Sequence, residues 1–189
     1  LGLVGSEMCI RDRLTSEQLA EPDFRIPVHT ANELVKLASR LTGEPTLGYH
    51  LGTQMRISIH GFIGYAIMTT HDIGEALVLA NRFIQLRMPF LQLFFSTFGE
   101  KATLQLRCDV DIEPLRTDIA ISIIFGIVSM SKALTGIENL AGEIDFDFPE
   151  PEGFDRYRAK LPNHSVRFDQ PHLLLSFDKH YLGLSLIHI

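Results

Sequence analysis

The spacing of apolar residues predicts two helices near the start of the chain. After Thr30, leucine and alanine recur every three or four positions, which is the pattern of an amphipathic helix. Thr30 and Glu33 match a capping box at its start, and Gly43 suits a left-handed C-cap at its end. A shorter helix is expected from Pro45 to Gly52.

Two longer helices are predicted further along. Asp72 and Glu75 cap the first of them, and Pro89 ends it. The second covers residues 115–134, where the apolar face is wide, and Gly136 follows as its C-cap.

The segment 55–65 has two interpretations. Ile57 and Ile59 alternate with polar residues, which is typical of a short extended segment. Alternatively, a buried helix begins at Phe62. In either case Gly64 allows the backbone to turn tightly or to approach a neighbour closely.

Alternation of apolar and polar residues predicts the strands. They lie at residues 90–97, 102–108, 144–148, 166–168 and 173–177. The first two form a hairpin around Gly99 and the last two a hairpin through Pro171, which follows a short helix at 152–161. N-terminal helices followed by the order ββαβαββ indicate an α+β fold, with a mostly antiparallel sheet and helices packed on one face.

Composition narrows the possible partners. The 189 residues carry a net charge of −6 without a cluster of lysine and arginine, so the chain is not expected to bind nucleic acid by itself. The apolar run 119–130 is too short to span a bilayer. Cys9 and Cys108 provide no disulfide framework, which favours a reducing compartment, and we expect a cytoplasmic protein.

Both ends of the chain look foreign to the rest. Residues 1–13 and 183–189 resemble translated sequencing-adapter read-through and continue no periodic pattern of their neighbours. We expect both ends to be artefacts that flank a single domain at 14–182, and we expect residues 1–13 and 184–189 to be dispensable for folding.

Motifs of known catalytic sites are absent from the sequence. The eight histidines fall at irregular spacings, so neither a metal ion nor another cofactor is expected. Asp145 and Asp147 alternate with apolar residues, which explains them as the solvated side of a strand. We therefore do not expect an enzyme.

An aromatic strand offers one wall of a ligand pocket. Phe94 and Phe95 lie among further phenylalanines at 90–97, which indicates either core packing or one side of an apolar cavity between this strand and the two long helices. Polar side chains near this cavity would orient a ligand. The candidates are His60, Tyr65, Arg82 and Arg87, although both arginines fit a charged surface equally well.

Five short motifs, in this order, resemble one protein family. They are FRIPV at 24–28, TGEPTLGYHLG at 42–52, HGFIGYA at 60–66, DIGEAL at 72–77 and VRFDQPHLLLSFD at 166–178. Together they resemble the N-terminal effector-sensing domain, also labelled arabinose-binding-like, of AraC-type transcription regulators. The family usually has threonine and leucine where this chain has Asp72 and Ile73, and that change keeps the cap and the apolar residue.

The resemblance implies a function in bacterial transcription regulation. It implies a domain that binds a small-molecule effector, forms a homodimer, or does both, and that reaches DNA only through a C-terminal helix-turn-helix domain absent from this chain. The effector is not identified by it, because family members respond to varied small molecules. Two alternatives stay open, namely a small-molecule enzyme that uses a histidine or carboxylate in the same cavity, and a ligand-free protein-interaction module.

Overall fold

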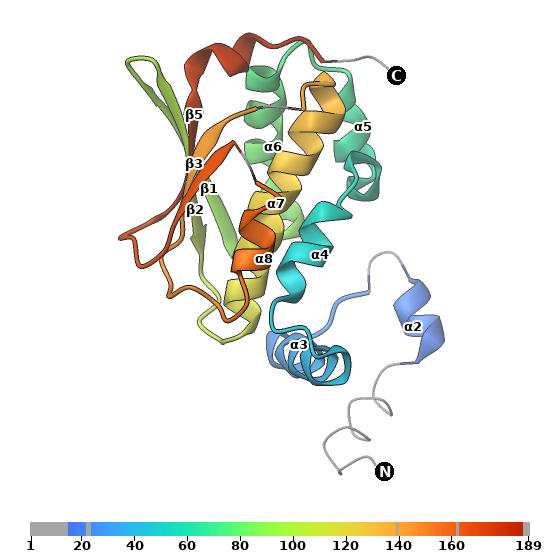
Figure 1. Cartoon of the computed structure of the whole chain (residues 1–189). Coiled ribbons are helices and arrows are strands. Elements are labelled where there is room, and N and C mark those ends of the chain that lie inside the picture. Colours follow the sequence, from blue (N-terminus) through green and yellow to red (C-terminus); the bar gives the residue numbers. More distant parts are fainter. Residues whose placement is uncertain (1–14, 22–23, 139, 162, 187–189) are drawn as a thin grey trace.

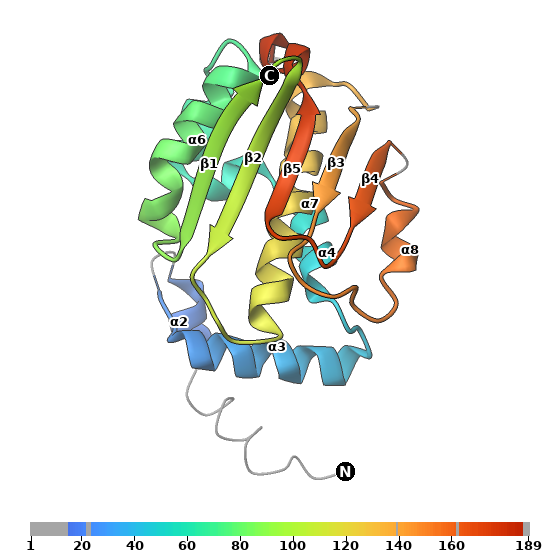
Figure 2. The same cartoon turned by 90° about the vertical axis from the view of Figure 1, so that its left-hand side faces the viewer.

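A sheet covered by helices on one face makes up most of the molecule, as Figure 1 shows edge-on and Figure 2 shows from the uncovered face. The computed structural model describes residues 15–21, 24–138, 140–161 and 163–186. The helices are α2 (Ser16–Ala20), α3 (Val28–Thr42), α4 (Leu47–Thr53), α5 (Phe62–Met68), α6 (Ile73–Arg87), α7 (Leu115–Thr135) and α8 (Asp155–Arg158), with the 3-10 helices η1 (Ile57–His60) and η2 (Lys179–Gly183). The strands are β1 (Leu91–Phe98), β2 (Lys101–Cys108), β3 (Gly142–Asp145), β4 (His164–Arg167) and β5 (Leu173–Asp178).

The sheet confirms the predicted α+β class but not the predicted final hairpin. Its strands lie in the order β1-β2-β5-β3-β4, so β5 is central and does not pair with β4. It pairs antiparallel with both β2 and β3, whereas β3 and β4 run parallel. The fully buried Leu173 and the buried Leu175 fit this central position, where a strand is covered on one face and bonded along both edges.

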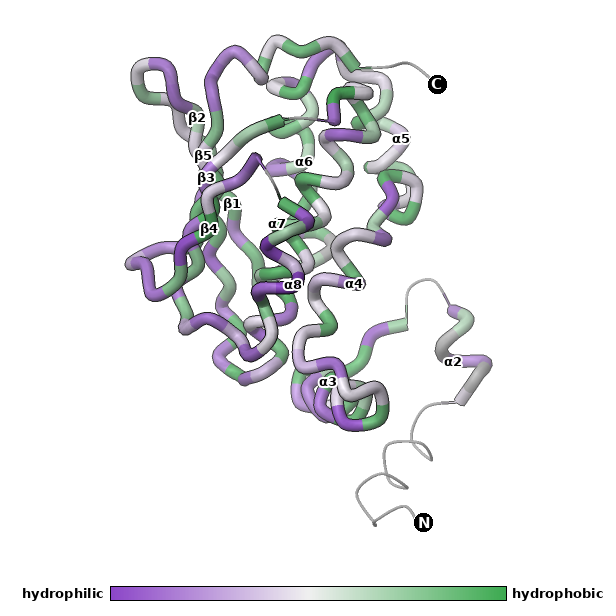
Figure 3. Tube along the Cα trace, in the orientation of Figure 1, coloured by the Kyte–Doolittle hydropathy of each residue, from purple (hydrophilic) through white to green (hydrophobic). Residues whose placement is uncertain are grey.

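Hydropathy along the chain follows this arrangement. Figure 3 shows hydrophobic and hydrophilic residues alternating along the strands, because successive side chains point to opposite faces of a sheet. In β1, Leu91 and Leu93 are buried on the helix-covered face, while Phe94 and Phe98 are exposed. The predicted β1–β2 hairpin around Gly99 is confirmed.

Helix α7 forms the centre of the core. Ile121, Ile124 and Phe125 are among its buried residues, and they pack with residues of the sheet. Among the described helices, α7 is the one long and apolar enough to cross a membrane by length and composition, and 44% of its apolar window is buried inside the protein. Contact with the sheet on one side and with α4 on another accounts for its wide apolar face.

Two glycines let α4 lie directly against α7. A Cβ at Gly48 would stand 2.3 Å from the carbonyl oxygen of Asp118, and one at Gly52 would stand 2.5 Å from that of Ser122. The backbone N–H of Gly48 donates a 2.7 Å hydrogen bond to Oδ1 of Asp118. The buried carboxylate therefore satisfies an unpaired amide in the first turn of α4.

The segment before α6 resolves the two sequence interpretations. Residues 57–60 form η1 and residues 62–68 form α5, so the helical interpretation is confirmed and the extended one is wrong. Gly61 joins them with φ 60°, a conformation that favours glycine. Gly64 does not lie in a turn but in α5, where it packs on the carbonyl oxygen of Ile57.

Three of the predicted helix caps are confirmed. Gly43 and Gly136 are left-handed C-caps with φ of 68° and 70°, and Oδ1 of Asp72 accepts a 2.8 Å hydrogen bond from the N–H of Glu75. The capping box assigned to Thr30 is wrong, because α3 begins two residues earlier and contains it. The helix predicted at 152–161 is shorter, at Asp155–Arg158.

The sequence suggested that Asp145 and Asp147 lie on the solvated side of a strand, but both carboxylates are paired with arginines. Asp145 accepts two hydrogen bonds from Arg167, at 2.7 and 2.9 Å, and Asp147 accepts one from Arg116 at 2.6 Å. Asp145 is only 9% exposed. The first pair joins β3 to β4 and the second joins the segment after β3 to α7, which is a structural use of both carboxylates.

The described part of the C-terminal segment packs against the helices. The N–H of Ile73 donates to the carbonyl of Leu184 at 3.2 Å, and the N–H of Leu186 donates to that of His71 at 3.1 Å. Leu186 is buried with Ile67 in a second core cluster. The expectation that residues 184–189 can be deleted without effect therefore does not fit residues 184–186, because their removal would expose this cluster. The same expectation for residues 1–13 and 187–189 lies outside the described residues.

The buried carboxylate of Asp118 should make stability depend on pH. Burial, aided by the neighbouring charge of Glu113, raises its pKa to about 6 against the hydrogen bond from Gly48. The folded protein therefore binds a proton at higher pH than the unfolded chain does, so this group's contribution to stability falls as pH rises from about 4 to about 6.

The variant Asp118→Asn keeps an oxygen acceptor but cannot ionise. We expect its free energy of unfolding, relative to that of the wild type, to increase between pH 4 and pH 7 in urea melts. A constant difference across this range would show that Asp118 titrates at an ordinary pKa.

Candidate functional site

Two adjoining pockets lie between the sheet and the helices. The first, here named the apolar pocket, encloses about 120 Å³ between η1, α5, α6, α7 and strands β1 and β2. The second, here named the polar pocket, encloses about 50 Å³ between α6, α7, η2 and strands β2 to β5. Leu77, Leu104 and Ile127 line both, so the two pockets meet at these three side chains.

The apolar pocket is lined almost entirely by hydrocarbon and thioether groups. Met55, Met88 and Met130 contribute flexible side chains that adapt to irregular shapes, and Phe83 contributes an aromatic one. His60 is the one titratable residue of this lining. An engineered apolar cavity of about 150 Å³ in another protein binds benzene, so this space suits a ring or short chain of similar size.

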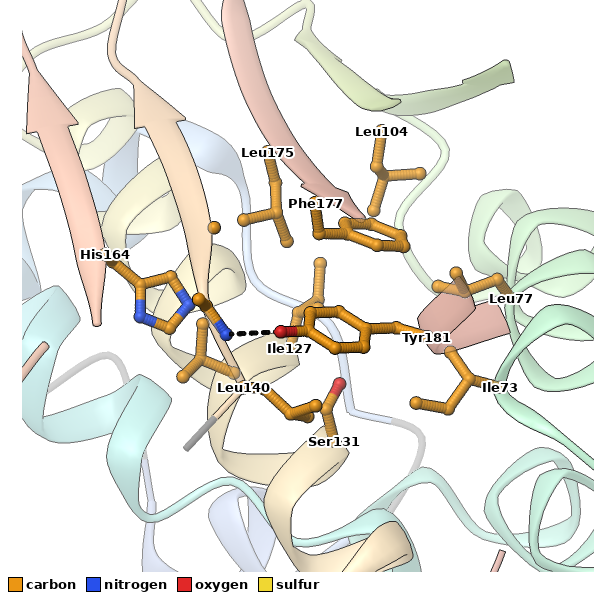
Figure 4. Close-up of a pocket in the computed structure, with 13 residues that line it drawn as sticks. Ile73, Leu77, Leu104, Ile127, Ser131, Leu140, His164, Leu175, Phe177 and Tyr181 are labelled. Atoms are coloured by element: carbon orange, nitrogen blue, oxygen red, sulfur yellow. Dashed lines mark hydrogen bonds between the residues drawn. The ribbon is translucent and has the colours of Figure 1, made fainter. Parts of the chain in front are cut away.

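The polar pocket brings three hydrogen-bonding side chains together. Figure 4 shows His164 from β4, Ser131 from α7 and Tyr181 from η2 around a common space, beside Leu175 and Phe177 from β5. The backbone N–H of Ala141 donates to the Tyr181 hydroxyl at 3.4 Å.

Hydrogen-bonding capacity remains available in this pocket. Within the described part of the chain, the Tyr181 hydroxyl donates to no acceptor, and neither the His164 ring nor the Ser131 hydroxyl forms a hydrogen bond. Burial, aided by the nearby charge of Lys132, lowers the pKa of His164, so its imidazole is neutral near pH 7.

The described residues that line the two pockets are uncharged near pH 7. Neither lysine, arginine, aspartate nor glutamate is among the described residues that line either pocket. The described residues also contain no group of three or more histidine, cysteine or acidic side chains placed to hold a metal ion. The arrangement can therefore bind an apolar group and form neutral hydrogen bonds.

Of the site residues predicted from the sequence, some are partly buried and others are exposed on the surface. His60 lines the apolar pocket. Phe95 faces the helices and packs against the main core, but lines neither pocket. Tyr65 lies in α5 and is 58% exposed. Phe94 is 50% exposed on the uncovered face of the sheet. Arg82 is exposed on α6, with its guanidinium 5.8 Å from the Phe83 ring centroid.

The structure thus brings only His60 of these five residues to a pocket wall. Tyr65, Arg82 and Phe94 lie outside both pockets, and the side chain of Arg87 lies outside the described residues. Sequence reasoning did not find His164, Ser131 and Tyr181. Their elements are joined by long-range pairing of β3 with β4 and of β3 with β5, which no local pattern encodes.

A second polar cluster has a structural role. The Glu44 carboxylate accepts hydrogen bonds from Arg156 and the Tyr157 hydroxyl, and it lies 3.1 Å from Nε2 of His50. Burial acts to raise the pKa of Glu44, but these hydrogen bonds lower it. Burial, together with the hydrogen bond to this carboxylate, raises the pKa of Tyr157 to about 12. The cluster fixes α8 to the loop before α4, and its groups are already paired.

Comparison with known proteins agrees with the motifs. A family model described as the arabinose-binding domain of AraC transcription regulators, N-terminal, matches residues 2–186. The ornithine utilization regulator of Pseudomonas aeruginosa is 26% identical over 170 residues, which are 90% of this chain and 50% of that protein. The chain therefore spans about half the length of this curated relative.

A solved structure shares the fold. The crystal structure of the transcriptional regulator CdpR from Pseudomonas aeruginosa has a TM-score of 0.66 at 16% identity, covering 100% of this chain and 59% of that chain. At this identity the likeness shows the fold alone. Because the family model matches nearly the whole chain, the chain belongs to the arabinose-binding domain family of AraC transcription regulators.

Proposed function

We propose that the apolar pocket is the effector site through which this domain controls a DNA-binding domain of a longer regulator. The observation that carries this proposal is an apolar space of about 120 Å³, bounded by η1, α5, α6, α7 and the sheet. Small-ligand sites are concave and mostly apolar with few polar groups, and this pocket has those properties.

The position of the pocket gives a physical route from ligand to regulation. A ligand there touches four helical elements and the sheet at once, and so it stabilises the arrangement in which they enclose it. By linkage, the ligand shifts the population toward that arrangement in proportion to its differential affinity. Both described relatives are regulators of greater length, which supports a separate DNA-binding part.

We also propose that the domain acts as a cytoplasmic homodimer and has no enzymatic activity. Ile59, Phe62 and Tyr65 expose 56%, 85% and 58% of their surfaces on neighbouring turns, which supports association of two copies. Light scattering would test it, and a strictly monomeric protein at high concentration would argue against it. The enzyme alternative lacks support, since the pockets hold no carboxylate beside either histidine among the described residues.

Because its net charge is −6, the domain alone should not bind DNA selectively. Fluorescence anisotropy at physiological salt tests this, and sub-micromolar, sequence-selective binding would contradict it.

The effector site is tested by filling the pocket. Ala80 lines it from α6, so Ala80→Phe should occupy the ligand space. Val78 lies on the same helix but is 62% exposed, which makes Val78→Phe a matched control. The probes are propylbenzene, a panel of apolar metabolites, and L-ornithine as a charged comparison suggested by the name of the relative.

We expect apolar probes to raise the melting temperature of the wild type and of Val78→Phe but not of Ala80→Phe. Saturation at about a hundred times Kd corresponds to roughly 2.7 kcal/mol, or about 5–10 °C for a domain of this size. An equal shift in Ala80→Phe would place the ligand elsewhere, and a shift by L-ornithine alone would contradict an apolar site.

A further inference from the structure

We propose that the polar pocket holds the head group of the effector, which is therefore an uncharged amphipathic molecule with an apolar body and one hydrogen-bonding group. This inference rests on the proposed effector site in the apolar pocket. It adds a second binding site, the chemical class of the ligand and the residues that select it.

The contact between the two pockets supports a single ligand. Leu77, Leu104 and Ile127 line both pockets and so form their common wall. A molecule whose apolar body fills the larger pocket would reach the smaller one by displacing these side chains. Together the pockets enclose enough space for a ring with a short chain, judged against the roughly 150 Å³ that accommodates benzene elsewhere.

The groups at the far end define the head. The Tyr181 hydroxyl has a proton without an acceptor among the described residues, and the Ser131 hydroxyl and the His164 ring can donate or accept. Gly142 contributes space here, because a Cβ at that position would stand 3.3 Å from Cδ2 of the His164 ring. Such a set fits an alcohol, carbonyl or amide.

The described lining of both pockets has no charged side chain, which favours an uncharged head group over a charged one. A carboxylate or ammonium in these pockets would lose its hydration without gaining an ion-pair partner, which is costly. Lys132, the cation that influences His164, does not line the polar pocket and lies 4.0 Å from Glu138. A neutral head avoids this cost and gains hydrogen bonds.

A matched series of ligands tests the inference. The probes are propylbenzene, 3-phenylpropan-1-ol, 3-phenylpropionate and 3-phenylpropylamine, which share a body and differ in the head. Binding is measured by calorimetry on the wild type and on the double variant Ser131→Ala, Tyr181→Phe, which removes only two hydroxyl oxygens. The control is Tyr65→Phe, which removes an exposed hydroxyl outside both pockets.

We expect the alcohol to bind about tenfold more tightly than propylbenzene, the gain of a buried hydrogen bond. The double variant should lose that gain while its affinity for propylbenzene is unchanged, and Tyr65→Phe should behave as the wild type.

Equal affinities for the alcohol and propylbenzene would overturn the head-group assignment and leave the effector site intact. Tighter binding of the acid or the amine would overturn the uncharged class. If Tyr65→Phe loses the tighter binding of the alcohol, the head group binds at the surface near Tyr65 and not in the polar pocket. Failure of every probe to bind would overturn the effector site together with this inference.

Discussion

Replacing Gly64 with valine is expected to lower the free energy of unfolding by about 3 kcal/mol or more. Gly64 is buried in α5, and a Cβ there would lie 1.9 Å from the carbonyl oxygen of Ile57. That oxygen belongs to the backbone of η1, so no side-chain rotation relieves the overlap. Helix α5 would have to move away from η1, which would also open the apolar pocket. Urea melts measure the loss.

Two variants serve as controls for this result. Gly183→Ala places a methyl group in open space, and it should change stability by less than about 0.5 kcal/mol. His60→Ala removes a partly exposed ring and should cost less than about 1 kcal/mol. If Gly64→Val lowers the free energy of unfolding by less than His60→Ala does, α5 does not pack on η1 in this way.

The variant Gly52→Ala is expected to separate α4 from α7 and to cost about 2–3 kcal/mol. The new methyl carbon would stand 2.5 Å from the carbonyl oxygen of Ser122 and 2.8 Å from Cβ of Phe125. Alanine improves helix propensity by up to about 1 kcal/mol, so a net loss can arise only from the helix contact.

A neighbouring residue provides the matched control. Leu51 lies in the same helix but is 59% exposed, so Leu51→Ala removes a larger side chain at little cost, below about 1 kcal/mol. Thermal melts of both variants compare them directly. If Gly52→Ala is as stable as the wild type, the close approach of α4 to α7 is incorrect.

Several helix ends were predictable from sequence because their signals are local. The glycines at 43 and 136 adopt the left-handed conformation expected after a helix, and Asp72 caps α6. The prediction of a capping box at Thr30 was wrong because α3 begins at Val28, after Pro27 at the N-cap position, without any side-chain cap. A proline at the start of a helix is itself a local signal, and here it outweighed the box.

Strand order was not predictable in the same way. The pattern of residues 166–177 indicates two strands but not that the second inserts between β2 and β3. A short connection favours pairing of neighbours in sequence, and here the hydrogen bonds of β5 go to strands far away along the chain. The leucine-rich sequence of β5 was the available sign of a central position.

The candidate site follows from that order. His164, Ser131 and Tyr181 come together only because β3 and β4 pair in parallel and η2 follows β5 directly along the chain. The sequence-based search used charge and aromatic density instead, and these led to Arg82 and Phe94, whose side chains are exposed. His60 was chosen as a polar side chain beside apolar residues, and it does line the apolar pocket.

The central claim, that an effector occupies the apolar pocket, is tested most directly by NMR of the protein with labelled methyl groups. In a sample with 3-phenylpropan-1-ol, nuclear Overhauser effects should join the phenyl protons to the methyl groups of Met55, Ile127 and Met130, which line this pocket. Contacts confined to exposed residues such as Leu86 and Val78, with the three pocket methyls unchanged, would contradict the account.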